Sequence, residues 1–135
     1  MEEIIRISNN IDELTVLTQK IEELGKKWEL SLPLLMTINL VLEEAVTNII
    51  FYAYDVKAEH EIDISFALKN RQLEITILDD GKPFDPTLKA QPDISLSAEE
   101  RKIGGLGIFL IQKMMDEVSY QRINNKNLLT LKKSI

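Results

Sequence analysis

The stretch RKIGGLGIFLIQKMMDEV, residues 101–118, places three of the chain's five glycines within four positions and then continues into an apolar helical pattern. Glycines ahead of a helix let backbone amides approach a phosphate. The dinucleotide fingerprint G-x-G-x-x-G does not fit, because Gly105, Gly107 and then Leu110 break its spacing. The P-loop pattern does not fit either, because neither Gly-Lys pair is followed by Ser or Thr. A phosphate site here therefore needs residues from other parts of the chain.

Length and composition indicate one domain. With 135 residues, 44% of them hydrophobic, we expect a single domain over residues 1–135 with enough apolar material for a core. The formal charge of −6 and the pI near 4.9 oppose direct binding to a nucleic-acid backbone.

Cysteine is absent and His60 is the one histidine, so disulfides, thiol catalysis and a Cys- or His-ligated metal cluster are excluded. The N-terminal Met1-Glu2-Glu3 lacks the basic region of a secretion signal, and no continuous apolar run approaches ~18 residues. We expect a cytoplasmic protein with no membrane segment.

Hydrophobic periodicity predicts helices and strands in alternation. The predicted helices cover about 11–28, capped by Asn9 or Asn10, about 33–54, beginning at Ser31 and Pro33, and the segment after the glycines. The predicted strands cover 4–8, 62–68, 73–77, 118–123 and 128–132, with a hairpin turn at Asn70-Arg71 and a connection over 124–127. Residues 81–102, with three prolines, indicate a functional loop because they exceed an ordinary connection.

The second predicted helix is apolar on nearly every side, which indicates burial, yet it contains Glu43, Glu44 and Asn48. Glu44 and Asn48 are four residues apart and share a face, whereas Glu43 lies about 100° around the helix. The spacing alone leaves two interpretations open. The carboxylate and the amide either form part of a site or meet water at an exposed edge.

The segment ITILDDGKPFDP, residues 75–86, is a hydrophobic strand that ends in Asp79-Asp80-Gly81. By itself Asp-Gly is an ordinary turn signal. Its interest lies in the order of three features along the chain: a helix with Glu-x-x-x-Asn, a strand ending in Asp-x-Gly-x-Pro, and a long loop leading to Gly-Gly-x-Gly and a helix.

In that order the chain resembles the Bergerat-fold (GHKL-type) ATP-binding domains, and more closely their single-domain branch of bacterial anti-sigma-factor serine/threonine kinases. LEEAVTNIIFYAY (42–54) is similar to the N box, LDDGKPFDP (78–86) to the first glycine box and GGLGIFLIQKMMDEVSY (104–120) to the second. One departure is visible, since Tyr52 stands where this branch often has histidine.

The resemblance implies a two-layer α/β sandwich: a mixed, mainly antiparallel sheet with three helices on one face and ATP between the helices and a lid. It implies that Glu44 is the general base, that Asn48 holds Mg²⁺, and that Asp79 accepts a hydrogen bond from the adenine amine. Gly81 would let the backbone pass beneath the base.

The glycines then cradle the phosphates at a helix N-terminus, with Lys102 or Arg101 pairing with the terminal phosphate and 84–103 forming the ATP lid. The residues that the resemblance assigns to ATP binding are Asn48, Asp79, Gly81, Pro83, Lys102, Gly104, Gly105, Leu106 and Gly107.

Several functions compete once ATP binding is granted. A histidine autokinase is disfavoured because the length leaves no phosphoacceptor helix pair, and a topoisomerase-like ATPase is disfavoured because no transducer domain follows. A serine/threonine kinase acting in trans and a non-catalytic, nucleotide-gated binding module both remain. A relative of the fold that binds no nucleotide is the third alternative.

For the kinase, the resemblance implies partner switching between a sigma factor and a small antagonist protein that is phosphorylated. It also admits a homodimer, since relatives of this branch make dimers. Glu44 favours the kinase over the binding module.

Overall fold

The computed structural model describes residues 1–54, 58–85, 87 and 105–135. The helices are α1 (Glu13–Lys27), α2 (Leu32–Tyr52) and α3 (Gly105–Met114), and the strands are β1 (Glu2–Ser8), β2 (Glu61–Lys69), β3 (Gln72–Asp79), β4 (Glu117–Ile123) and β5 (Lys126–Ser134).

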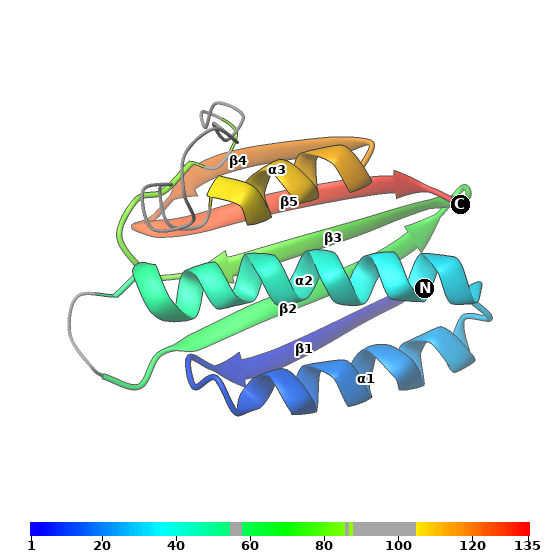
Figure 1. The fold of residues 1–135 in the computed structure, drawn as a ribbon, viewed down its shortest axis with the longest axis horizontal. Coiled ribbons are helices and arrows are strands. Elements are labelled where there is room, and N and C mark those ends of the chain that lie inside the picture. Colours follow the sequence, from blue (N-terminus) through cyan, green and yellow to red (C-terminus); the bar gives the residue numbers. More distant parts are fainter. Residues whose placement is uncertain (55–57, 86, 88–104) are drawn as a thin grey trace.

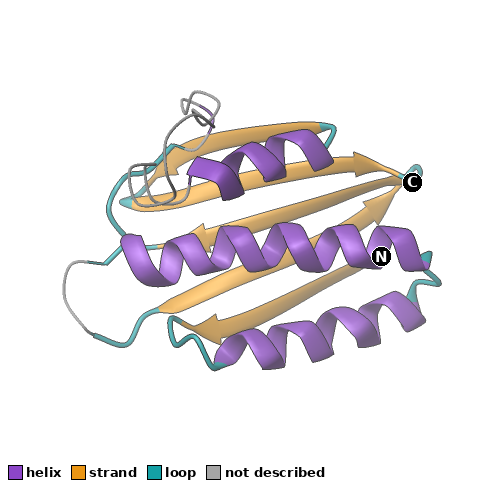
Figure 2. Ribbon diagram, viewed as in Figure 1, coloured by secondary structure: helices purple, strands orange, loops and turns teal. Residues whose placement is uncertain are grey.

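The five strands form one sheet in the order β1-β2-β3-β5-β4, and each of these pairings is antiparallel. The three helices lie side by side over the same face of the sheet, with α2 between α1 and α3 (Figure 1; Figure 2). This arrangement confirms the predicted two-layer sandwich with helices on one face. The prediction of a mixed sheet was wrong, since the described strands pair only antiparallel. Because β5 lies between β3 and β4, the last hairpin is next to the strand that carries Asp79.

Alternation along the strands explains which face the helices cover. On β2 and β3 every second residue is fully buried beneath the helices, while their neighbours face the other side. The buried apolar side chains of these two strands are Ile62, Ile64, Phe66, Leu73, Ile75 and Ile77. They pack with Ile38, Val41, Leu42 and Val46 of α2, so the central helix and the central strands share one core.

The observed starts of α1 and α2 can be compared with the caps predicted from the sequence. Ser31 caps α2, because its Oγ accepts a hydrogen bond from the Leu34 amide at 3.3 Å. This confirms the predicted start of the second helix. The predicted start of the first helix at Ile11 was two residues early. Asn10 Oδ1 accepts from the Asp12 amide at 2.9 Å, which forms a turn, and α1 begins at Glu13.

The two hairpins turn on residues with positive φ. Asn70 and Arg71 have φ of 53° and 62°, which confirms the predicted turn. At the β4–β5 hairpin the predicted connection over 124–127 was too long. Asn124 and Asn125 suffice for the turn, with φ of 50° and 63°, and Asn127 belongs to β5.

Of the helices described, α2 alone has the length and apolar composition of a membrane-spanning segment. Buried central helices of compact domains share that composition. The core side chains of α2 lie against the sheet, which is a sufficient reason for its hydrophobicity.

Candidate functional site

A cavity of about 120 Å³ lies where the C-terminal end of α2, the start of α3 and the ends of β3, β4 and β5 meet. The cavity is much larger than one water molecule needs, so it can hold a ring-sized group. The lining is mainly apolar with a few polar groups, as is usual for small-molecule sites. It consists of Ala45, Asn48, Ile49, Tyr52, Ala53, Asp79, Lys82, Pro83, Phe84, Ile108, Ile111, Tyr120, Asn127 and Leu129.

Asp79 is a buried carboxylate in this lining, only 5% exposed. Burial raises its pKa, while hydrogen bonds from Asn127 and from the Gly81 amide, and the charge of Arg122, act in the opposite direction. Asp79 Oδ1 accepts both of those bonds, at 3.0 Å from Asn127 Nδ2 and at 2.8 Å from the Gly81 amide. The carboxylate is therefore held in one orientation within an apolar cavity.

Gly81 has a structural reason to lack a side chain. A Cβ at this position would lie 2.5 Å from Ala53 Cβ and 2.7 Å from the Ala53 carbonyl oxygen. That carbonyl also accepts a hydrogen bond from the Lys82 amide at 2.9 Å. The end of α2 thus rests directly on the backbone that follows β3, which brings Asn48 and Asp79 into one cavity.

Asn127 is the residue that sequence reasoning missed, because it was assigned to a connecting turn. It is 5% exposed, and with Asp79 it makes up the buried polar side chains of the described residues. Its Nδ2 donates to Asp79 and, at 2.9 Å, to the Lys82 carbonyl. Its Oδ1 accepts from Tyr120 Oη at 2.6 Å and from Arg122 Nη1 at 3.1 Å. No pattern in the sequence marked it, because its position opposite Asp79 follows from the pairing of β3 with β5.

Glu44 and Asn48 take different places on one face of α2. Asn48 lines the cavity. The Glu44 carboxylate lies against Gly107, and a Cβ on that glycine would collide with Glu44 Oε2. Glu43 instead lines a groove between α1 and α2. The predicted separation of Glu43 from the other two side chains is therefore present.

The structure describes only part of the second glycine box. The helix α3 begins at Gly105, so glycines do precede and open a helix that borders the cavity, and Gly107 lies in its first turn. The Leu106 side chain, Gly104, Lys102 and Arg101 lie outside the described residues. Most of the predicted lid over 84–103 does so too, while Phe84 lines the cavity together with Lys82 and Pro83.

Comparison with known protein families identifies the family of this chain. A family model described as the histidine kinase-like ATPase domain matches residues 7–133, which include every element from β1 to β5. The chain belongs to the histidine kinase-like ATPase domain family. Membership in an ATPase domain family implies ATP use, and the cavity lined by Asn48 and Asp79 is where the three sequence boxes converge.

Curated relatives within this family are named as protein kinases. The chain is similar to the serine-protein kinase RsbW of Listeria monocytogenes serovar 1/2a, with 33% identity over 85 residues, or 60% of this chain and 54% of the relative. It is similar to the serine/threonine-protein kinase BtrW of Bordetella bronchiseptica, with 32% identity over 108 residues, or 80% of this chain and 75% of the relative. The RsbW of Oceanobacillus iheyensis is 34% identical over 93 residues, or 66% of this chain and 57% of the relative.

The matches to the RsbW relatives thus span little more than half of their length. The histidine kinase-like ATPase domain is the part that the comparisons establish for this chain. The resemblance stated from the sequence is confirmed at the level of that family.

Proposed function

We propose that this histidine kinase-like ATPase domain is a cytoplasmic serine/threonine protein kinase of the anti-sigma-factor type. It uses Mg-ATP to phosphorylate a small antagonist protein in trans, and it binds a sigma factor when the antagonist is modified. The kinase names of its relatives support this activity. Residues 1–135 form the catalytic domain.

One observation carries the proposal: α2 presents Glu44 and Asn48 one turn apart, where α3 begins and beside the cavity that holds Asp79. In this proposal the adenine amine donates to Asp79, and the phosphates extend toward the N-terminus of α3, whose free amides favour anions. Glu44 then lies where it can take the proton of an attacking serine or threonine hydroxyl.

The residues present fit a magnesium ion that binds together with nucleotide. Within the described segments no group of three or more His, Asp or Glu side chains is arranged to hold a metal. Mg²⁺ is commonly held by one or two protein oxygens plus substrate phosphates and waters, and the Asn48 amide oxygen is such a ligand. When bound, the ion supplies positive charge that stabilises the transferring phosphoryl group.

The first experiment is calorimetry of Mg-ATP with the purified chain, followed by incubation of the ATP-bound protein with candidate acceptor proteins. We expect ATP binding and one phosphoserine or phosphothreonine on the acceptor. ATP binding with no phosphorylated protein in a lysate of the source organism would instead support the nucleotide-gated binding module.

Glu44→Gln tests the general base against a matched control on the same helix. We expect nearly intact Mg-ATP binding and a ~10²–10⁴-fold slower phosphoryl transfer, the usual effect of losing general-base assistance. Glu43→Gln is the control, because Glu43 lines the α1–α2 groove and should transfer phosphate at the parent rate. If the Glu43 variant is the one that loses activity, the site is misplaced.

Asn48→Ala tests the metal ligand. Because the amide oxygen would be lost, affinity for Mg-ATP and the rate of transfer should fall together. The control is Asn39→Ala, since Asn39 lies on α2 but lines the α1–α2 groove. Equal Mg-ATP affinities in the Asn48 variant and the parent would remove Asn48 from the site.

A further inference from the structure

Asn127 has no hydrogen-bonding capacity left for a ligand, although it lines the cavity. Its two amide hydrogens go to Asp79 Oδ1 at 3.0 Å and to the Lys82 carbonyl at 2.9 Å. Its Oδ1 accepts from the Tyr120 hydroxyl at 2.6 Å and from Arg122 Nη1 at 3.1 Å. An amide oxygen accepts two strong bonds and an amide nitrogen donates two, so the group is saturated. Asn127 therefore acts on a nucleotide through the groups that it bonds, among which Asp79 is the buried carboxylate of the cavity lining.

The bonds to Asp79 determine which of its oxygens a ligand meets. Within the described residues, the hydrogen bonds of this carboxylate all reach Oδ1, from Asn127 and from the Gly81 amide. Rotation of the carboxylate would break both bonds inside an apolar cavity, where unpaired polar groups are costly. Oδ2 therefore remains as a fixed acceptor for a donor on the ligand.

We propose that Asn127 is a positioning residue that orients Asp79 and thereby sets the preference of the site for adenine over guanine. This inference rests on the proposed ATP-binding function. Adenine presents an exocyclic amine, which donates to a carboxylate oxygen, whereas guanine presents a carbonyl oxygen at the equivalent ring position, which that oxygen repels. The discrimination requires that Oδ2 keep its position.

Arg122 connects this positioning to the backbone that follows β3. Its Nη1 donates to the Gly81 carbonyl at 2.8 Å as well as to Asn127. A charged donor strengthens the bonds it makes, and the guanidinium partly offsets the charge of Asp79. The β4–β5 hairpin thus holds both the carboxylate and the segment that leaves it. The carboxylate, its positioning amide and the cavity wall form one hydrogen-bonded unit.

The test uses Asn127→Asp and a control with the same chemical change, Asn125→Asp. Asn125 lies two residues away in the exposed turn, and its φ of 63° is one that aspartate tolerates. In the Asn127 variant a carboxylate replaces the donor beside Asp79. We expect ATP to bind roughly 10-fold more weakly, equivalent to about 1.4 kcal/mol, with a similar loss in the ratio of ATP to GTP affinity. Asn125→Asp should bind both nucleotides as the parent does.

The pH profile separates positioning from a merely structural role. In the parent, ATP affinity should fall on acidification, because a protonated Asp79 carries an O–H donor and is a weaker acceptor than the carboxylate. In Asn127→Asp, affinity should first rise as the pH is lowered from about 8, because two adjacent carboxyls take up a shared proton and restore a donor to Asp79. Among the described residues, the charged or titratable groups around Asp79 include Tyr54, Asp80, Lys82, Tyr120, Arg122 and Lys126, with His60 on Asp80.

Asn127→Leu provides a second variant that carries no charge. Thermal unfolding of each variant shows whether it folds, and both variants are compared at temperatures below their transitions. A parent that binds no ATP would overturn the proposed function. A parent that binds ATP, with Asn127 variants that keep its affinity, its ATP to GTP ratio and its pH profile, would overturn the role of Asn127 alone.

Discussion

Asp79 is an ionisable group in an apolar cavity, and its neighbours explain how its ionised form is stabilised there. Burial alone would favour the neutral acid, since an unpaired buried carboxylate is strongly disfavoured. The Gly81 amide, the Asn127 amide and the Arg122 guanidinium stabilise the ionised form. The pKa nevertheless stays above the ordinary value for aspartate, which keeps the carboxylate a strong acceptor.

Asp79→Asn should weaken ATP binding by ~1–3 kcal/mol, the usual cost of an unsatisfied buried polar group. The new amide would keep its oxygen toward the Gly81 and Asn127 donors and turn its NH₂ toward the adenine amine, so that two donors face each other. Calorimetry measures the change. Asp80→Asn is the control, because Asp80 is 46% exposed and bonds to His60 at 3.1 Å. Equal affinity in both variants would mean that Asp79 is only a turn residue.

The raised pKa of Asp79 also predicts opposite pH effects on stability and on binding. The folded state holds the Asp79 proton more firmly than the unfolded state does, so the contribution of this group to stability falls as the pH rises from the ordinary value of 3.8 through the raised pKa. Over the same window ATP affinity should rise. Urea unfolding and calorimetry of the parent and Asp79→Asn across this range measure both effects, and the difference between the two proteins gives the contribution of Asp79.

At the scale of elements, the sequence predicted the helices and strands well because their patterns are local. The stripe of α1, the Ser31 cap of α2 and the alternation of β2 and β3 are each set by neighbouring residues. Family resemblance added the one-sided helix layer, which local patterns do not specify. In the structure Glu44 of α2 also lies against Gly107 of α3, although more than 50 residues separate the two helices in the sequence.

The role of Asn127 could not be predicted, because it depends on the register of strands that are distant in sequence. Asn127 lies opposite both Asp79 on β3 and Arg122 on β4. A shift of one residue would turn its side chain to the other face of the sheet. Four polar residues in a row at 124–127 read as a loop, and only the two-residue turn leaves Asn127 within the strand.

Gly107→Ala tests the contact between α2 and α3. Alanine favours helix by up to ~1 kcal/mol over glycine, and the clash falls on the mobile end of the Glu44 side chain, so the variant should fold with nearly parent stability. The displaced carboxylate should lower phosphoryl transfer by up to ~10²-fold, as small misplacements of catalytic groups do. Thermal unfolding and transfer assays give the two results. Parent activity in a folded variant would contradict the catalytic placement of Glu44.

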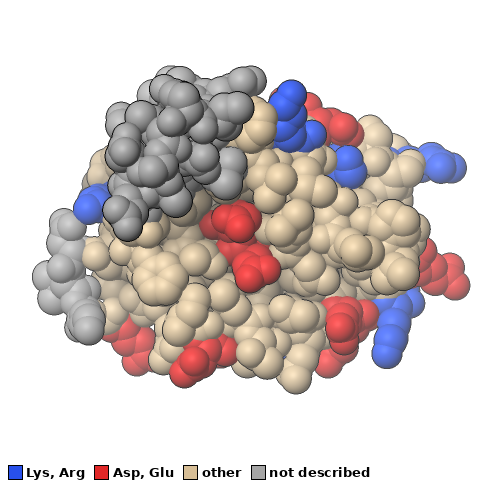
Figure 3. All heavy atoms as spheres, viewed as in Figure 1, with Lys and Arg blue, Asp and Glu red and all other residues tan. Residues whose placement is uncertain are grey.

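The whole molecule consists of a sheet that is covered by helices on one face and open on the other (Figure 1). Acidic side chains gather at the centre of the helix face, where α2 runs (Figure 3).

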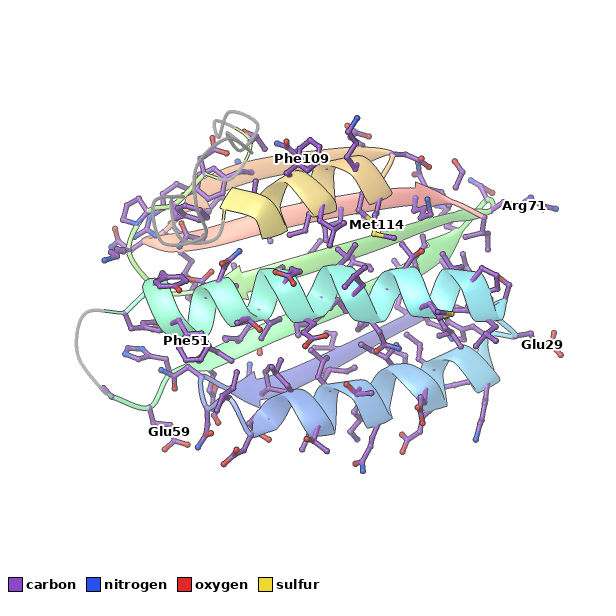
Figure 4. All side chains as sticks on the ribbon, in the orientation of Figure 1. Glu29, Phe51, Glu59, Arg71, Phe109 and Met114 are labelled. Atoms are coloured by element: carbon purple, nitrogen blue, oxygen red, sulfur yellow. The ribbon has the colours of Figure 1, made fainter. Side chains whose placement is uncertain are left out.

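On α3, Met114 lies on the side toward α2 and Phe109 lies on the opposite side (Figure 4). The Lys113 Nζ lies 5.6 Å from the centroid of the Phe109 ring. The open face of the sheet pairs Arg6 with Asp63 at 2.6 Å.

Burial rather than surface charge should decide the stability of this construction. Phe66 is 1% exposed at the centre of the core, and Phe66→Ala should lower the free energy of unfolding by ~3–5 kcal/mol, through lost transfer energy and a cavity. That is a large fraction of the ~5–15 kcal/mol typical of a domain. Arg6→Ala, on the adjacent strand, removes an ion pair whose arginine side chain is 62% exposed, and should hardly move the urea midpoint.

Because Phe66 is not among the residues that line the cavity, Mg-ATP at about 100 times its dissociation constant should stabilise the Phe66→Ala variant by roughly 2.7 kcal/mol, as it does the parent. A variant that folds but gains nothing from saturating nucleotide would show that the core and the site are coupled more tightly than the structure indicates.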